Sequence, residues 1–192
     1  MAMSFLGLLI FTAAAGAGPL DSAGAQKSLV CSACHGFAGN TPGQHMPVLA
    51  GMNANYFKKA IKDYAEGKRS SPEMEPYSKY VLQFGLDEIA DYFASQKKPA
   101  LVNVKVEAKA LSRGATLASQ CIACHGPKGD GARVIPALRG QPKGFLQTQM
   151  ALFAGDKRKL EIAELEEAKK LSFKGLSEAD FADLATYYAT LK

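Results

Sequence analysis

The pattern Cys-x-x-Cys-His occurs twice in the sequence, and no other feature constrains the fold as strongly. The copies are Cys31-Ser32-Ala33-Cys34-His35 and Cys121-Ile122-Ala123-Cys124-His125, which together contain all four cysteines and two of the three histidines. Two thiols at this spacing can form thioethers with the two vinyl groups of one porphyrin, and the adjacent histidine can then bind the iron. The motifs predict two covalently attached haem c groups, held by Cys31, Cys34, His35, Cys121, Cys124 and His125.

Other uses of paired cysteines explain the pattern less well. A thioredoxin-type redox pair belongs to a βαβ unit, and no segment of this chain alternates like a strand. A zinc site shared between the motifs would leave unexplained why each second cysteine is followed directly by a histidine. Two haems account for all six residues.

The two motifs belong to an internal repeat. Gly24 and Gly114 each lie seven residues before the first cysteine of their motif, and a Pro-x-Leu-x-Gly stretch follows each motif, at 47–51 and 136–140. Each half is small for an independent core, so we expect each domain to fold around its own haem. The expected boundaries are a domain at 26–98, a linker at 99–106 and a domain at 107–192.

The fold class predicted from the sequence is all-α. Apolar residues recur at three- and four-residue spacing in two segments, and good helix formers precede the second motif. Ser177 and Asp180 resemble a capping box at the start of the last helix, and Asp87 is expected to cap the corresponding helix of the first half. Helices are therefore expected at 55–66, 107–120, 144–154 and from Ser177 to Leu191.

The first residues resemble a secretory signal. Residues 5–18 are apolar and small, which is too short for a bilayer span of roughly 20 residues. Ala23-Gly24-Ala25 is a candidate cleavage site, although no Lys or Arg precedes the apolar stretch. We expect residues 1–25 to be a signal peptide, with retention as an anchor as the alternative, and no membrane span in the mature chain.

Charge excludes one class of partner. The formal net charge is +5, and acidic residues are interleaved with the basic ones. A nucleic-acid-binding surface needs concentrated positive charge, so none is expected. A mildly basic surface favours an acidic protein partner.

The first iron has a candidate sixth ligand in Met74. This residue lies between two prolines in the polar stretch 71–76, which is expected to be a loop. A large apolar side chain there is explained if its thioether binds iron, and the alternative is that it fills a gap in the core. Met46 and Met52 are interpreted as core or haem-edge packing, and His45 as a haem-edge or surface residue.

The second half has no methionine at the matching position. Counting back from the last helix, Met74 corresponds to Lys169. The sixth ligand of the second iron is therefore open between the Lys169 amine, water, no ligand, and the thioether of Met150. In the simplest alternative Lys169 and Lys170 form a solvated pair within a charged inserted loop at 156–170.

These residues and motifs resemble the dihaem cytochromes c4 and, equally, the dihaem cytochrome subunit of flavocytochrome c sulfide dehydrogenase. Met74-x-Pro76 matches the distal methionine loop of cytochromes c4. The resemblance implies two class I cytochrome c domains with approximate twofold symmetry and haem propionates near the domain interface. Arg69 and Arg158, at matched positions of the repeat, would suit the propionates, and a surface position for each is the alternative.

The resemblance also implies function. It predicts a periplasmic electron-transfer cytochrome, either a soluble carrier or the cytochrome subunit of a sulfur-oxidising complex, with a flavoprotein sulfide dehydrogenase subunit or a terminal oxidase as partner. The alternative is a haem enzyme acting on thiosulfate, another small sulfur anion or peroxide at an open or Lys169-ligated second haem. No acid–base constellation accompanies that haem, so no catalytic residue is assigned; a purely structural second domain is a further alternative. Because a Met ligand favours a high potential, we expect electrons to enter at the second haem and leave from the first.

Overall fold

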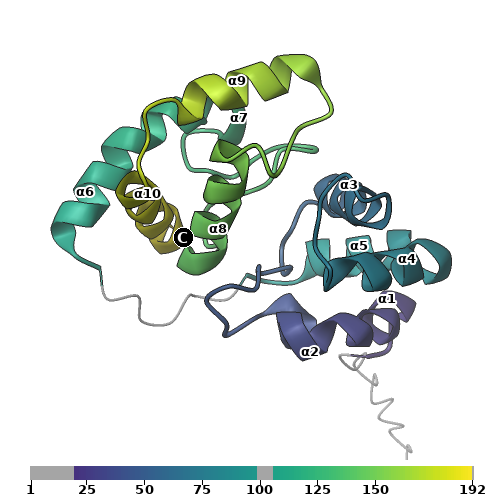
Figure 1. Ribbon diagram of the computed structural model, residues 1–192. Coiled ribbons are helices and arrows are strands. Elements are labelled where there is room, and N and C mark those ends of the chain that lie inside the picture. The colour runs from purple at the N-terminus through teal and green to yellow at the C-terminus, as the bar shows by residue number, and fades with distance from the viewer. Residues whose placement is uncertain (1–19, 99–105, 192) are drawn as a thin grey trace, which may run out of the picture.

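The computed structural model describes residues 20–98 and 106–191. Within these ranges the chain is helical, and its only β contact is an isolated bridge between Ala132 and Ile135. The chain forms two helical halves that lie side by side (Figure 1). The all-α prediction is therefore confirmed. Most of the expected signal peptide and linker lies outside the described residues.

The first half packs its helices around one apolar cluster. Helix α3 lies against α4 and α5, and α1 lies against α5. The rings of Phe57 and Phe93 meet in this cluster with their centroids 5.6 Å apart. The elements are α1 (Ala23–Lys27), η1 (Ser28–Cys31), α2 (Ser32–His35), η2 (Phe37–Gly39), α3 (Ala54–Ala65), α4 (Met74–Phe84) and α5 (Leu86–Ser95).

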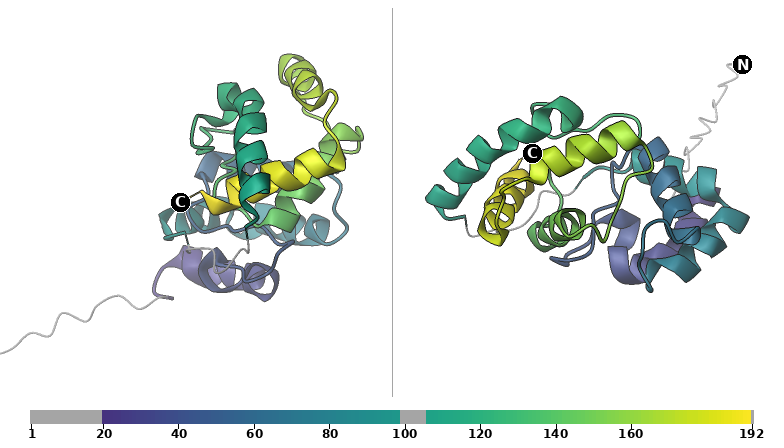
Figure 2. Two further views of the ribbon diagram at one scale, coloured as in Figure 1. Left: turned by 90° about the vertical axis from the view of Figure 1, so that its left-hand side faces the viewer. Right: turned by 45° about the horizontal axis from the view of Figure 1, so that its top comes forward.

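The second half repeats this plan with one longer connection. Helix α10 crosses α6 and also packs on α8, as Figure 2 shows from two sides. Its apolar cluster includes Leu146, Leu184 and Tyr188. The elements are α6 (Ala108–Leu117), η3 (Ala118–Cys121), α7 (Ile122–His125), α8 (Lys143–Ala154), α9 (Ala163–Phe173) and α10 (Glu178–Thr190).

Gly24 and Gly114 explain part of the repeat. A Cβ on Gly24 would overlap the carbonyl oxygen of Glu88, and a Cβ on Gly114 would overlap that of Asp183. Each glycine therefore allows the helix before the motif to cross the last helix of its half at close range. This crossing fixes where each Cys-x-x-Cys-His turn begins.

Several sequence predictions of helices hold, and three need correction. The capping box of Ser177 and Asp180 is present at the start of α10. Asp87, by contrast, lies inside the first turn of α5, whose N-cap is Gly85. The expected loop at 71–76 contains the start of α4, and the expected loop at 156–170 contains most of α9. Pro76 does not prevent α4, because a missing N–H costs nothing in the first helical turn.

The two halves meet through segments that follow each motif. The Gln141 side-chain amide donates to the Val48 carbonyl oxygen at 2.9 Å, and its oxygen accepts from the Val48 N–H at 3.0 Å. The Phe145 N–H donates to the Gln44 carbonyl oxygen at 2.9 Å. None of the helices described is long and apolar enough to cross a membrane.

Candidate haem sites

Each Cys-x-x-Cys-His motif lies on one tight helical turn. The first cysteine ends a 3-10 turn, and the α-helical turn that follows carries the second cysteine and the histidine. Residues three and four positions apart share a helix face, so both thiols and the imidazole are brought to one side. None of the four cysteines forms a disulfide. Within the described ranges no three Cys, His, Asp or Glu side chains are grouped to hold a metal ion.

A proline carbonyl orients each motif histidine. Nδ1 of His35 lies 2.9 Å from the Pro47 carbonyl oxygen, and Nδ1 of His125 lies 2.9 Å from that of Pro136. Because a carbonyl can only accept, Nδ1 carries the proton and Nε2 keeps a free lone pair, the arrangement of metal-binding histidines. Burial lowers the pKa of both histidines, and the bond to the carbonyl only partly opposes this. Each imidazole is thereby kept in the neutral form that binds iron.

Met74 packs on the apolar core of the first half. It is the first residue of α4, is half-buried, and packs on the same apolar cluster as Cys31. Its N–H donates to the carbonyl and the hydroxyl oxygen of Ser71, at 3.1 and 3.3 Å. In the second half, Met150 and Cys121 pack on one apolar cluster in the same way.

Lys169 is buried and held by an ion pair. Its Nζ lies 2.7 Å from Glu166 Oε1, 3.4 Å from the Arg158 carbonyl oxygen and 3.6 Å from the Asp156 carboxylate. Burial acts to raise the pKa of Glu166, but the bonds from Lys169 and from a backbone N–H outweigh it and hold that pKa below its usual range. Lys170 is exposed and pairs with Glu167 instead. The two lysines are therefore not a solvated pair.

Arg69 and Arg158 come together at the boundary between the halves. Arg69 is 7% exposed and donates to Gln149 Oε1 at 2.9 Å, and Arg158 donates to the same oxygen. Arg69 also donates to the Tyr56 hydroxyl at 3.4 Å. Their guanidinium groups lie over the matched rings of Tyr64 and Phe153, each 4.4 Å from the centroid. The alternative of a surface position is therefore wrong for Arg69.

The arginine pair needs negative charge. Burial lowers the pKa of Arg158, and the neighbouring Arg69 lowers it further. Burial acts to raise the pKa of Tyr56, but both guanidinium groups outweigh this and lower it. The bonding partners described for these guanidinium groups are neutral, and a shielded pair of cations is costly without an anion. The carboxylates of haem propionates fit this requirement, so the residues present suit the haems that the motifs imply.

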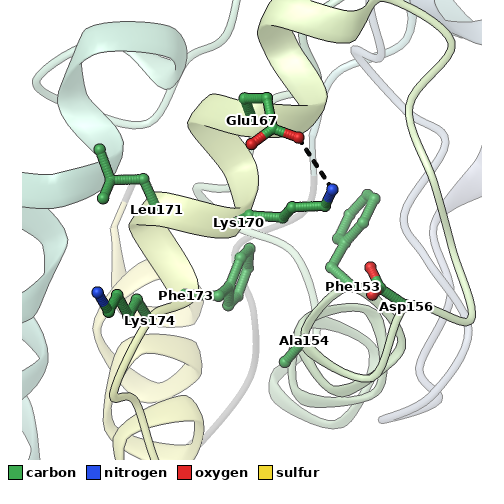
Figure 3. A pocket seen from close by; sticks show the side chains of 8 residues that line it. All are labelled: Phe153, Ala154, Asp156, Glu167, Lys170, Leu171, Phe173 and Lys174. Carbon is green, nitrogen blue, oxygen red and sulfur yellow. Dashed lines mark hydrogen bonds and ion pairs between the residues drawn. The ribbon is translucent and has the colours of Figure 1, made fainter.

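A separate hollow of about 390 Å³ lies between α8 and α9 (Figure 3). Phe153 and Phe173 form its aromatic wall, and Lys170 pairs with Glu167, which lies one turn earlier on α9. No motif cysteine or histidine lines it, so it is not assigned to a haem. Its lining residues are Phe153, Ala154, Asp156, Glu167, Lys170, Leu171, Phe173 and Lys174.

Sequence analysis missed several residues of these sites. The Pro-x-Leu-x-Gly repeat was visible, but it does not show that the proline carbonyl orients the histidine. Gln141 and Gln149 give no signal in one sequence, because a glutamine at an interface looks like one on a surface. Met46 is 41% exposed and is not part of the core, whereas Met52 packs on the first core as expected. His45 is exposed, as expected, and its ring lies against Gly144 of the other half.

Two motif turns, two oriented histidines and a shared arginine pair define a protein with two class I cytochrome c domains. Residues 111–192 match the family model of cytochrome c. Cytochrome c4 of Pseudomonas aeruginosa is 37% identical over 140 residues, which are 69% of this chain and 70% of that protein. The thiosulfate dehydrogenase electron acceptor of Stutzerimonas stutzeri is 30% identical over 143 residues, which are 69% of this chain and 66% of that protein.

A solved structure extends the likeness to the whole fold. The crystal structure of reduced cytochrome c4 from Pseudomonas stutzeri matches with a TM-score of 0.79 at 27% identity, over 88% of this chain and 97% of that one. The chain belongs to the cytochrome c4 family. It carries two covalent haem c groups, one for each motif, and acts as an electron-transfer protein.

Proposed function

We propose that this protein is a periplasmic carrier that takes electrons from a dehydrogenase of inorganic sulfur compounds and passes them to a terminal oxidase. The observation that supports the proposal is the network at the boundary between the halves, where Gln149 accepts from both Arg69 and Arg158, the expected propionate partners of the two haems. The likeness to a thiosulfate dehydrogenase electron acceptor supports the donor class. Assembly as a permanent subunit of such a dehydrogenase is the second form of the same proposal.

The protein residues have distinct roles in this proposal. The haems supply one-electron exchange when bound. Cys31, Cys34, Cys121 and Cys124 fix them covalently, and His35 and His125 are the proximal ligands. Met74 is the sixth ligand of the first haem, because it shares a packing cluster with the motif of that half. Arg69 and Arg158 hold the propionates near the domain boundary.

For the second haem we propose that Lys169 occupies the position of the sixth ligand without binding at rest. An amine must turn its lone pair toward the iron in order to bind it, and here the Lys169 Nζ instead donates a hydrogen bond to Glu166 and one to the Arg158 carbonyl oxygen. The missing thioether favours a lower potential than that of the first haem. Electrons then enter at the second haem and leave from the first.

The same position supports the alternative function. A sixth position without a protein ligand is open to a small sulfur anion, and Lys169 and Arg158 add positive charge beside it. Against catalysis, the family relationship is to electron carriers. The hypothesis of a haem enzyme is therefore the second candidate, after the electron carrier.

One experiment separates these functions. Oxidised holoprotein is mixed with thiosulfate, with and without catalytic amounts of a thiosulfate dehydrogenase, and haem reduction is followed by absorbance. A carrier is reduced only when the dehydrogenase is present, and the first haem, which has the higher potential, is the first to accumulate in the ferrous form. Rapid reduction by thiosulfate alone would establish the enzyme, and no reduction in either mixture would contradict the sulfur-linked role.

We also propose that signal cleavage falls earlier than Ala25. Residues 23–27 form α1, and Gly24 and Ala25 are buried against α5. Removal of this segment would expose the face of α5 on which it packs. Intact-mass measurement of periplasmic holoprotein tests this: the mature chain should begin at or before Ser22 and carry two haems, and a start at Gln26 would contradict it.

A further inference from the structure

Ser78 is buried in the middle of α4 with an unsatisfied hydroxyl. The residue is 0% exposed, and its Oγ has no hydrogen-bond partner among the described residues. Leaving a buried hydroxyl without a partner is costly, so a native protein normally supplies one. The missing partner therefore comes within reach of this hydroxyl only in the haem-loaded protein.

Other helical hydroxyls in the chain behave differently. A serine or threonine inside a helix commonly donates to the carbonyl four residues earlier. Ser78 does not, although its carbonyl partner would be that of Met74. Four residues make this bond, at 2.7–3.2 Å: Thr116, Thr148, Ser172 and Thr186.

Helix geometry places Ser78 beside the Met74 side chain. The two residues are four apart, so they lie on one face of α4, which also carries the buried Val81. Side chains on a helix lean toward its N-terminus, so Ser78 covers the turn that begins at Met74. Met74 packs on the first core together with Cys31 of the haem motif.

The second half lacks both members of this pair. Where the first half has Met74 and Ser78, the repeat has Lys169 and Phe173. Phe173 has an apolar side chain, packed 5.8 Å from the ring of Phe181. The buried hydroxyl therefore occurs only in the half that has the methionine.

We propose that Ser78 is a positioning residue for the first haem: its Oγ–H donates to the Met74 sulfur. This rests on the proposed role of Met74 as sixth ligand. The bond fixes the orientation of the thioether and withdraws electron density from the sulfur. A sulfur that donates less electron density to the iron stabilises the ferric state less, and this loss is larger than for the ferrous state. The hydrogen bond therefore raises the potential of the first haem.

Holoproteins carrying Ser78→Ala and Ser78→Thr test the proposal, because the first removes the donor and the second keeps it. The readouts are the two haem potentials and the sulfur-to-iron charge-transfer band of the ferric protein. We expect Ser78→Ala to shift the band and to lower the equilibrium constant for reducing the first haem by about 2- to 10-fold, the effect of one hydrogen bond. In Ser78→Thr the band and the potential of the first haem should stay near those of the unmodified protein. The potential of the second haem should not change in either variant.

Met74→Ala and Ser172→Ala are the controls. Ser172→Ala removes a helical hydroxyl that bonds only to its own helix, so neither potential should change. If the band is lost in Met74→Ala but unmoved in Ser78→Ala, the hydrogen bond is wrong and the ligand assignment stands. If the band is still present in Met74→Ala, Met74 is not the ligand, and the proposed hydrogen bond to it is wrong as well. Equal shifts in Ser78→Ala and Ser78→Thr would show a packing effect and overturn the proposal.

Discussion

At the scale of single residues, backbone carbonyls and buried ion pairs decide what the side chains can do. The carbonyl oxygens of Pro47 and Pro136 accept a hydrogen bond from Nδ1–H of the two motif histidines, which leaves the Nε2 lone pair free. Glu166 accepts a hydrogen bond from the buried amine of Lys169. The two halves therefore share the orientation of their motif histidines and differ at the matched positions of Met74 and Lys169.

Lys169→Met should convert the second haem to the type of the first. The methionine takes the position that Met74 holds in the first half, and a thioether needs no deprotonation to bind iron. We expect the absorbance of the sulfur-to-iron charge-transfer band to double, because both haems then contribute to it. We also expect redox titration to show a higher potential for the second haem. Lys170→Met, at the exposed neighbour, should change neither. An unchanged spectrum in Lys169→Met would show that this position does not face the iron.

Glu166 should make the stability of the second half depend on pH. Its pKa is lower in the folded chain than in the unfolded chain, so the ion pair stabilises fully above the unfolded value of about 4.3 and is lost as the pH falls through the folded one. Glu166→Gln should remove this part of the acid dependence. It should also lower the free energy of unfolding at pH 7, by up to about 3 kcal/mol, because buried Lys169 loses its nearest carboxylate and keeps only the exposed Asp156 at 3.6 Å. Thermal unfolding from pH 3 to 8 checks both, with the exposed Glu167→Gln as control.

The sequence predicts the sites unevenly at this scale. Cysteine and histidine spacing identifies the haem attachment residues, because thioether chemistry and helical geometry leave few other uses for it. The burial of Lys169 could not be predicted, since a lysine among glutamates looks like a solvated face. Its partners come from two segments, Arg158 and Glu166, that only the folded chain brings together.

At the scale of elements, close helix crossings and first-turn residues shape each half. Helices 55–66 and 144–154 were predictable because one apolar face recurs along each of them. Helices α4 and α9 were not, because their sequences are rich in charge or contain proline. Packing and the acidic first turn stabilise α9 where local propensity gave no clear signal.

Gly114→Ala should destabilise the second half. The added methyl group would overlap the Asp183 carbonyl oxygen and force α6 away from α10. We expect a loss of about 1–3 kcal/mol from overpacking, which exceeds the gain of up to about 1 kcal/mol in helix propensity. Thermal unfolding of the holoprotein measures the change. The control is Ser112→Ala, at an exposed position of the same helix, which should not lower stability. If Gly114→Ala is as stable as the unmodified protein, α6 can shift away from α10 without cost and the prediction is wrong.

At the scale of the whole molecule, buried polar contacts rather than surface charges join the halves. Glu161 pairs with Lys68 at 2.5 Å and Lys59 at 3.6 Å across the boundary, but these side chains are partly solvated and contribute little. Gln149 bridges the arginines, and Gln141 bonds twice to the backbone of Val48. These contacts hold the two halves in one arrangement.

Gln141→Ala should uncouple the halves. It leaves the Val48 N–H and carbonyl oxygen buried without partners, each costing about 1–3 kcal/mol, while every contact within a half is kept. Calorimetry of the holoprotein should therefore show two unfolding transitions in the variant where the unmodified protein shows one. At temperatures below both transitions the haem charge-transfer band should be unchanged. Gln120→Ala, at an exposed glutamine before the second motif, should preserve the single transition. Cooperative unfolding of Gln141→Ala would mean that the arginine–glutamine network alone couples the halves, and then Gln149→Ala should separate them.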